Sequence, residues 1–115
     1  MLLLVLSLAC GAGAADTASA AADTGADACT LLTYDNFGEA FIRNWCMNCH
    51  AASTEGDARY GAPSGVDFDT HDDVVAWADR IAARADVDTP TMPPAGGADA
   101  SERARLAEWL ACGAP

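Results

Sequence analysis

The sequence predicts an all-α domain, a small bundle of about three helices joined by long loops. Three segments, at about residues 36–46, 71–85 and 100–112, repeat apolar side chains every three or four residues, as one face of an α-helix does. The chain between them is rich in glycine and proline, and no segment shows convincing strand alternation. At 115 residues the chain is expected to hold one domain at most.

The first helix is expected to start at Asn36, a good N-cap residue. Glu39 follows three residues later and would complete a capping box. Phe37, Phe41 and Trp45 then recur every four residues and form one apolar stripe, which predicts that this face is buried.

The middle helix is expected to be capped by Thr70, with Asp73 as the shorter partner of the box. Acidic residues lie in its first turn and arginines towards its end, which suits the helix dipole. Its predicted buried face consists of Val74, Trp77, Ala78, Ile81 and Ala85.

The last helix is expected to open with Asp99 and Glu102 as a second capping pair. Gly113 supplies a residue that tolerates the left-handed conformation at its end. Its predicted buried residues are Leu106, Trp109 and Leu110.

The first 28 residues are expected to lie outside the folded domain. Residues 1–10 form an apolar run that is too short to span a bilayer and ends at Cys10. This run resembles a bacterial lipobox, in which the signal is cut before the cysteine and the thiol is lipidated; the alternative is ordinary signal cleavage after Ala14. Residues 11–28 contain only Ala, Asp, Thr, Gly and Ser, so they are predicted to be a flexible tether. Residues 29–115 remain for the folded domain.

Charge and cysteine content restrict the partners and the compartment. The formal charge of −11 argues against nucleic acid and against electrostatic binding to anionic lipid. It favours a basic partner or serves solubility alone.

Cys29 and Cys112 bracket the folded domain, and an even pair in an exported domain predicts a disulfide between them. Membrane attachment would then come from lipidated Cys10.

Cys46, Cys49 and His50 form a Cys-x-x-Cys-His motif, which is the spacing of covalent haem attachment. Two intervening residues let one turn place both sulfurs at the vinyl groups of the porphyrin, and the histidine then binds iron as proximal ligand. A zinc knuckle would need a second ligand pair, for which His71 and Cys112 are a poor choice. A thioredoxin-like dithiol would open a helix after a strand, whereas this motif closes a helix. One covalent haem c is therefore the predicted cofactor.

Residues 34–112 resemble a class I (mitochondrial-type) bacterial cytochrome c. In that family the first helix runs into the attachment motif and carries a glycine eight residues before the first cysteine, which is the place of Gly38 here. The resemblance implies that this glycine lets the last helix cross closely, with Trp109 as the aromatic ring beside it. It also implies that a proline carbonyl accepts the hydrogen bond of the proximal histidine ring, with Pro63 as the counterpart.

The resemblance further implies a methionine as the sixth iron ligand, on the loop between the last two helices. Met92, followed by Pro93 and Pro94, fits this pattern. Soft thioether sulfur favours ferrous iron, and a proline-stiffened loop keeps such a bond closed. The alternatives are that Met92 only fills an apolar gap, or that His71 is the distal ligand. His71 lies in a charged first helical turn and is expected to be solvated.

Three side chains of the middle helix remain open between two roles. Trp77, Arg80 and Arg84 would suit the edge of a haem, for instance with an arginine hydrogen-bonded to a propionate. A core tryptophan and two solvated arginines that complement the helix dipole explain the same residues equally well.

These features predict a monohaem c-type cytochrome that transfers single electrons between redox partner proteins, and not an enzyme. The expected location is the periplasm or cell envelope of a Gram-negative bacterium. The alternative is a haem enzyme or small-ligand sensor of peroxidase type, which would need a displaceable distal ligand and acid–base groups beside it. A structural lipoprotein with an accidental motif would leave the loop around Met92 unexplained.

Overall fold

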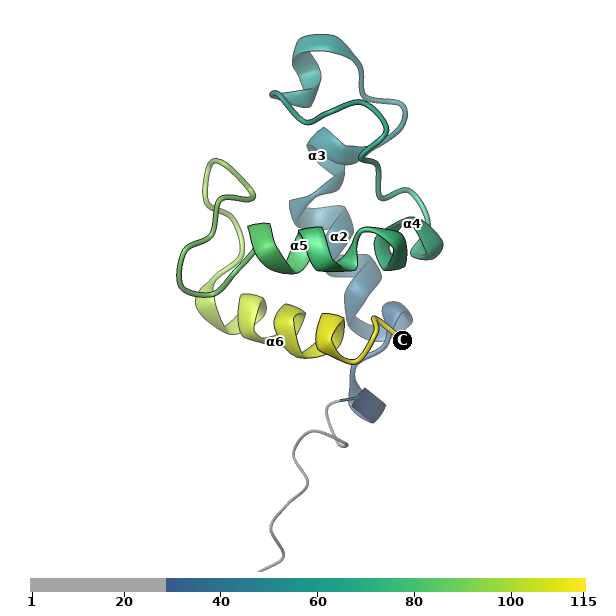
Figure 1. Cartoon of the computed structure of the whole chain (residues 1–115), viewed down its shortest axis with the longest axis vertical. Helices are drawn as coiled ribbons and strands as arrows, with labels where there is room; N and C mark the ends of the chain where they lie inside the picture. Colours follow the sequence, from purple (N-terminus) through teal and green to yellow (C-terminus); the bar gives the residue numbers. More distant parts are fainter. Residues whose placement is uncertain (1–28) are drawn as a thin grey trace, which may run out of the picture.

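The computed structural model describes residues 29–115, and within this range it contains helices, turns and loops but no strand (Figure 1). The predicted all-α class is confirmed. In chain order the elements are one helical turn at residues 29–31, the π-helix η1 (Tyr34–Gly38), α2 (Glu39–Trp45), α3 (Met47–His50), the 3-10 helix η2 (Gly56–Arg59), α4 (His71–Ala76), α5 (Ala78–Arg84) and α6 (Ala100–Ala111).

The first helix starts at Tyr34, two residues earlier than predicted, and its N-cap is Thr33 and not Asn36. The Thr33 hydroxyl accepts a hydrogen bond from the Asn36 amide at 3.3 Å, and the Thr33 amide donates to Asn36 Oδ1 at 2.9 Å. Asn36 is therefore the third residue of a capping box, and the predicted box with Glu39 is wrong. The opening π turn continues into α2, and Cys46 links α2 to the short α3.

The middle helix has the predicted cap but is divided in two. Thr70 and Asp73 form the expected capping box at the start of α4. At Trp77 the backbone leaves helical geometry, with ψ at 6°, and α5 starts at the next residue. Of the predicted buried face, Val74, Ile81 and Ala85 are buried, whereas Trp77 and Ala78 are only half-buried.

The last helix agrees with its prediction at both ends. The Asp99 carboxylate accepts hydrogen bonds from the amides of Ser101 and Glu102 at 2.8 and 2.9 Å, and the Glu102 side chain completes the capping box. Gly113 follows the helix with φ at 85°, the left-handed conformation expected of a glycine stop. Because both signals are local, the sequence was sufficient to place this helix.

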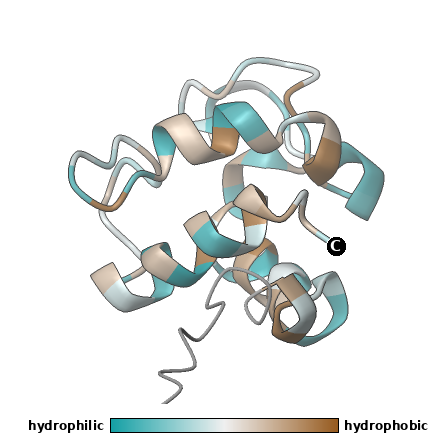
Figure 2. Ribbon diagram, turned by 60° about the horizontal axis from the view of Figure 1, so that its bottom comes forward, coloured by the Kyte–Doolittle hydropathy of each residue, from teal (hydrophilic) through white to brown (hydrophobic). Residues whose placement is uncertain are grey.

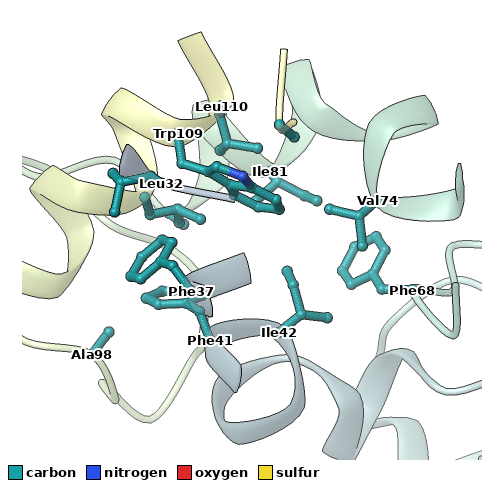
Figure 3. Packing of buried hydrophobic residues seen from close by; sticks show 13 residues of the cluster. Leu32, Phe37, Phe41, Ile42, Phe68, Val74, Ile81, Ala98, Trp109 and Leu110 are labelled. Atoms are coloured by element: carbon teal, nitrogen blue, oxygen red, sulfur yellow. The ribbon is translucent and has the colours of Figure 1, made fainter. Parts of the chain in front are cut away.

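The core lies between three helical layers. In Figure 1, α5 and α6 lie side by side, and the rod formed by η1, α2 and α3 crosses them. Side chains from all three layers converge at this crossing (Figure 3). The largest side chains that are almost completely buried are Ile42, Val74, Leu106 and Trp109.

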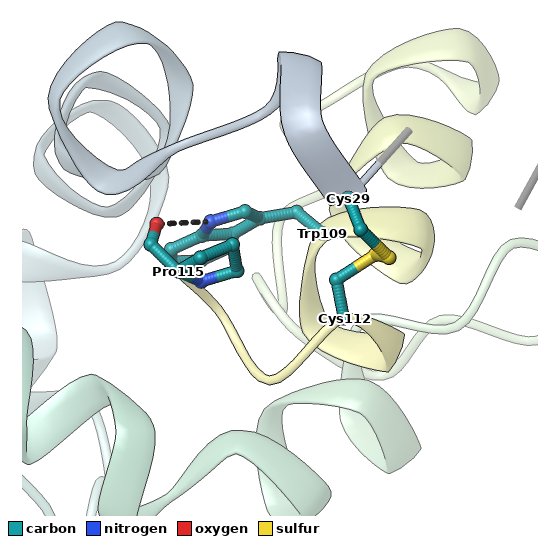
Figure 4. Close-up of a disulfide and its surroundings, with 4 residues drawn as sticks. All are labelled: Cys29, Trp109, Cys112 and Pro115. Carbon is teal, nitrogen blue, oxygen red and sulfur yellow. Dashed lines mark hydrogen bonds between the residues drawn. A yellow bond between two sulfur atoms is a disulfide. The ribbon is translucent and has the colours of Figure 1, made fainter. Parts of the chain in front are cut away.

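Gly38 allows the closest approach of these layers, as the resemblance implied. A Cβ at this position would overlap the six-membered ring of Trp109, which rests directly against the glycine. The Trp109 indole donates a hydrogen bond to the Pro115 carbonyl at 3.2 Å (Figure 4). Cys29 and Cys112, the pair expected to be bonded, form a disulfide at the same end of α6, with their Cα atoms 5.2 Å apart.

Hydrophobic and hydrophilic residues alternate along the helical ribbons (Figure 2). This distribution is typical of helices that bury one face and expose the other. Among residues 29–115, no helix is long and apolar enough to cross a membrane.

Candidate functional site

An apolar cavity of about 270 Å³ is the candidate site. It brings together the four predicted cofactor residues, Cys46, Cys49, His50 and Met92, although Met92 belongs to the loop between α5 and α6. The other residues that line it are Phe41, Trp45, Arg59, Tyr60, Ala62, Pro63, Val66, Phe68, Trp77, Arg80, Ile81, Arg84, Ala85, Pro93 and Pro94.

The His50 ring is fixed on one side by a backbone carbonyl. Its Nδ1 lies 2.6 Å from the Val66 oxygen, and a carbonyl can only accept, so Nδ1 carries the proton. In the neutral ring this leaves the lone pair on Nε2, the state that a metal-ligating histidine requires. The Phe68 ring stacks on the imidazole with the ring centroids 4.5 Å apart. The expectation that Pro63 would supply the carbonyl is wrong, because the loop turns three residues further before it reaches His50.

Arg59 organises the loop that carries this carbonyl. The side chain is buried, with 5% of its surface exposed, and its guanidinium lies 2.7 Å from the Asp67 carboxylate. Its remaining hydrogen bonds go to backbone oxygens of the same loop, those of Ala51, Thr54, Ala62, Pro63 and Val66. One side chain thus satisfies the backbone of an irregular segment and positions the acceptor for His50.

The two motif thiols are free, and the first is held in its neutral form. Burial raises the pKa of Cys46 to about 12, with the nearby Arg103 acting in the opposite direction and Cys49 adding to the rise. A redox-active dithiol needs a cysteine whose pKa is lowered, so the environment of Cys46 does not suit that chemistry. In the part of the chain that the structure describes, no three His, Cys, Asp or Glu side chains are grouped to hold a metal ion.

Met92 is held in its loop on both sides of its backbone. Its amide donates to the Arg84 carbonyl at 2.9 Å, and its carbonyl accepts from Arg103 Nη1 at 2.9 Å. Further along the loop, Gly97 has φ at 103° and lies close to the Trp45 ring. A Cβ there would lie 3.0 Å from both Trp45 Cε3 and Pro93 Cγ. The loop therefore folds tightly over the first helix at the cavity.

Trp45, Arg80 and Arg84 line the cavity with polar groups that lack a partner within residues 29–115. The indole nitrogen of Trp45 is buried and has no hydrogen-bond acceptor. Arg80 and Arg84 are exposed, and their guanidinium groups form no ion pair or hydrogen bond with the described residues. A buried donor without a partner is costly, and two cations at the rim of an apolar cavity suit a mainly apolar ligand with anionic substituents. Haem, with its two propionates, has this character.

His71 is not solvated, contrary to expectation, and it is not part of the cavity lining. Its ring is half-buried and stacks on Tyr34, with the centroids 4.3 Å apart and the planes at 14°. Its Nε2 lies 2.7 Å from the Ala114 oxygen and therefore donates to it. These contacts tie α4 to the C-terminus and give His71 a structural role.

Arg59, Arg103 and the unpartnered Trp45 nitrogen were not found by sequence reasoning. A signal existed for Arg103, because it shares a helical face with the buried Leu106 and Leu110. Nothing comparable marks Arg59 in its loop.

Cys10 lies outside the described residues, so its lipidation stays a prediction. Comparisons with protein families, with curated protein sequences and with solved structures found no match for this chain.

Proposed function

We propose that this chain is a monohaem c-type cytochrome that carries single electrons in the cell envelope of a Gram-negative bacterium. The observation that carries the proposal is the convergence of Cys46, Cys49, His50 and Met92 on one apolar cavity. The first three residues are consecutive members of the attachment motif, but Met92 reaches the same cavity from a distant loop. An accidental motif would not account for this meeting.

Each of the four residues has a separate task in the proposal. Cys46 and Cys49 form the two thioether links, and His50 binds iron through Nε2 because Nδ1 is committed to the Val66 carbonyl. Met92 would be the second protein ligand of the iron. The haem supplies a centre that accepts and releases one electron.

The unpartnered polar groups fit the acidic edge of this cofactor. Arg80 and Arg84 stand one helical turn apart on α5, so both can face the same rim of the cavity. We assign them to the propionates, since charge-assisted hydrogen bonds from arginine to carboxylate are among the strong ones. The buried Trp45 indole nitrogen is a further donor that the filled site can satisfy.

An electron carrier is favoured over a haem enzyme by the composition of the cavity lining. An enzyme of peroxidase type requires acid–base groups beside the distal face of the iron. Among the described lining residues there is no carboxylate, and His50 is the one histidine. The thioether of Met92 would close the iron instead of leaving a site for substrate.

An extracytoplasmic location is supported by the disulfide between Cys29 and Cys112, since such bonds persist in oxidising compartments. Redox proteins of the envelope are then the expected partners. Attachment to the membrane would depend on lipidation of Cys10.

The proposal is tested by the covalent bond itself. After maturation in a bacterial periplasm, haem should stay on the chain through acid–acetone extraction and denaturing electrophoresis. The Cys49→Ser variant should lose normal double attachment, whereas His71→Ala, whose histidine lies outside the cavity, should retain it. Loss of the pigment from the wild-type chain under these conditions would refute the proposal.

A further inference from the structure

Arg103 is the second buried arginine of the domain, and it binds a different loop from Arg59. It lies on α6, and 4% of its surface is exposed. Its guanidinium donates to four backbone oxygens that all belong to the connection between α5 and α6, at 2.9 to 3.3 Å. These acceptors are Ala85, Met92, Gly96 and Ala98.

The charge of Arg103 has no carboxylate partner. Within residues 29–115 the two ion pairs are those of Arg43 with Glu39 and of Arg59 with Asp67. A buried cation without a counter-ion is costly unless many dipoles solvate it. A leucine here would simply extend the apolar face of Leu106 without that cost. What only arginine offers is five donors in one rigid plane, which can gather several carbonyls at once.

The carbonyls that Arg103 gathers determine where Met92 lies. The methionine backbone is bound on its amide side by the Arg84 carbonyl and on its carbonyl side by Arg103. The loop has no other regular structure, as its trace between α5 and α6 in Figure 1 shows. The position of the Met92 side chain over the cavity therefore depends on a contact made by a separate helix.

We propose that Arg103 is a positioning residue that locks Met92 onto the iron and so closes the site to external ligands. This inference rests on the proposed function of the cavity. It adds that the distal ligand is controlled by the docking of α6, and that loosening one guanidinium converts a closed electron carrier into a ligand-binding haem protein.

The test measures the binding of imidazole to the ferric protein. Arg103→Gln removes most of the hydrogen bonds to the loop, and Arg103→Lys keeps the charge but offers one compact donor group. We expect the dissociation constant of imidazole to fall at least about tenfold in Arg103→Gln, since each lost bond to a charged donor shifts the open–closed equilibrium. Arg103→Lys should bind more tightly than wild type as well.

Arg105→Gln is the matched control. It removes the same charge from the same helix, but Arg105 is exposed, lies over the Phe37 ring at 4.8 Å and has no hydrogen bond to the loop. It should bind imidazole as weakly as wild type. In Arg103→Gln the sulfur-to-iron band of the oxidised protein should weaken without any imidazole. An Arg103→Gln protein with the wild-type band and wild-type imidazole affinity would overturn the inference, as would an equal change in Arg105→Gln.

A measurement on the wild-type protein covers the case in which the variants do not mature. The Arg103 Nε–H and the Met92 amide should both exchange slowly with solvent, because both are bound within the loop. Rapid exchange of either would overturn the inference. If instead the wild-type chain carried no covalent haem, the proposed function would fail first, so the two failures are distinguishable.

Discussion

The loops on the two sides of the cavity are built alike but held differently. The proximal loop, residues 51–70, follows His50, and the distal loop, residues 85–99, carries Met92. Each is organised by one buried arginine that binds backbone carbonyls. Arg59 belongs to the loop that it binds and is neutralised by Asp67, whereas Arg103 reaches the distal loop from α6 and has no carboxylate beside it in the described chain.

Under the proposed function, this difference predicts that Met92 would be lost from the iron more easily than His50. The proximal loop contains its own scaffold, and covalent attachment through the adjacent Cys49 would also hold His50 in place. The distal loop depends on the packing of α6 against the rest of the domain. Disturbances of α6 should therefore loosen the distal loop before the proximal loop, whereas loss of Arg59 should loosen the proximal loop first.

The largest expected effect comes from the disulfide, which anchors the end of α6. The Cys29→Ser/Cys112→Ser variant should lose about 4 to 5 kcal/mol of unfolding free energy, an upper figure from chain entropy for a sequence separation of 83 residues. Denaturant titration of the ferric protein measures this loss. Hydrogen exchange should show the distal loop loosening before the proximal loop. Two alkylatable thiols in the native wild-type protein, apart from the haem-bound ones, would contradict the bond.

Removal of Arg59, the buried arginine of the proximal loop, should cause the second largest loss of unfolding free energy. Arg59→Met leaves the Asp67 carboxylate and several carbonyls without their donor, and we expect a loss of about 3 to 4 kcal/mol. Arg43→Met is the matched control, because Arg43 is exposed and its pair with Glu39 should contribute less than about 1 kcal/mol. Equal losses in the two variants would remove the distinction between the buried and exposed arginines.

A smaller loss of unfolding free energy is expected from a substitution at the crossing of η1 and α6. Gly38→Ala places a methyl group against the Trp109 ring and should cost about 1 to 3 kcal/mol by overpacking. Because α6 must shift to make room, the imidazole affinity of the ferric protein should rise with the loss of stability. The double variant with Trp109→Phe should lose less than the sum of the single variants, since the smaller ring relieves the overlap. Strict additivity would contradict the close contact.

The sequence predicted the elements whose signals are local. The N-caps Thr70 and Asp99 predicted where α4 and α6 start, because a cap side chain binds amides only two or three residues further along the chain. Gly113 predicted where α6 ends. Asn36 was wrongly predicted as the N-cap because it does take part in a capping box, but as the partner of Thr33. The break at Trp77 could not be foreseen, since no side-chain cap marks the start of α5.

The sequence identified residues that line one cavity, but not the residues that hold the surrounding loops in place. The motif and the Met-Pro-Pro segment identified side chains that the structure brings to one cavity. The carbonyl that fixes His50 is that of Val66 and not of Pro63, because the path of the loop is set by Arg59. Val66 acts through its backbone carbonyl, which every residue carries, so no sequence pattern reveals it, whereas Arg103 shares a helical face with buried leucines and could have been found.

The smallest effect concerns the cap at the end of the distal loop. Hydrogen bonds from Ser101 and Glu102 hold the pKa of Asp99 below its usual 3.8. A lowered pKa in the folded state gives stability that is present above pH 3.8 and is lost as the pH falls through the lowered value. Asp99→Ala should therefore be less stable than wild type at neutral pH and show a shallower decline in acid. Acid titrations followed by circular dichroism measure both, and parallel curves would contradict the assignment.

A reduced-minus-oxidised optical spectrum of the protein matured in a periplasm tests whether Cys46, Cys49 and His50 hold a haem that Met92 closes. The wild-type spectrum should be that of a c-type cytochrome, and the oxidised form should show the weak sulfur-to-iron band in the near-red region. Met92→Ala should abolish that band, lower the reduction potential and raise peroxidase activity, whereas His71→Ala should change none of these. A wild-type protein without haem absorbance would contradict the account, and an absent band together with a haem spectrum that responds to His71→Ala would contradict the assignment of Met92.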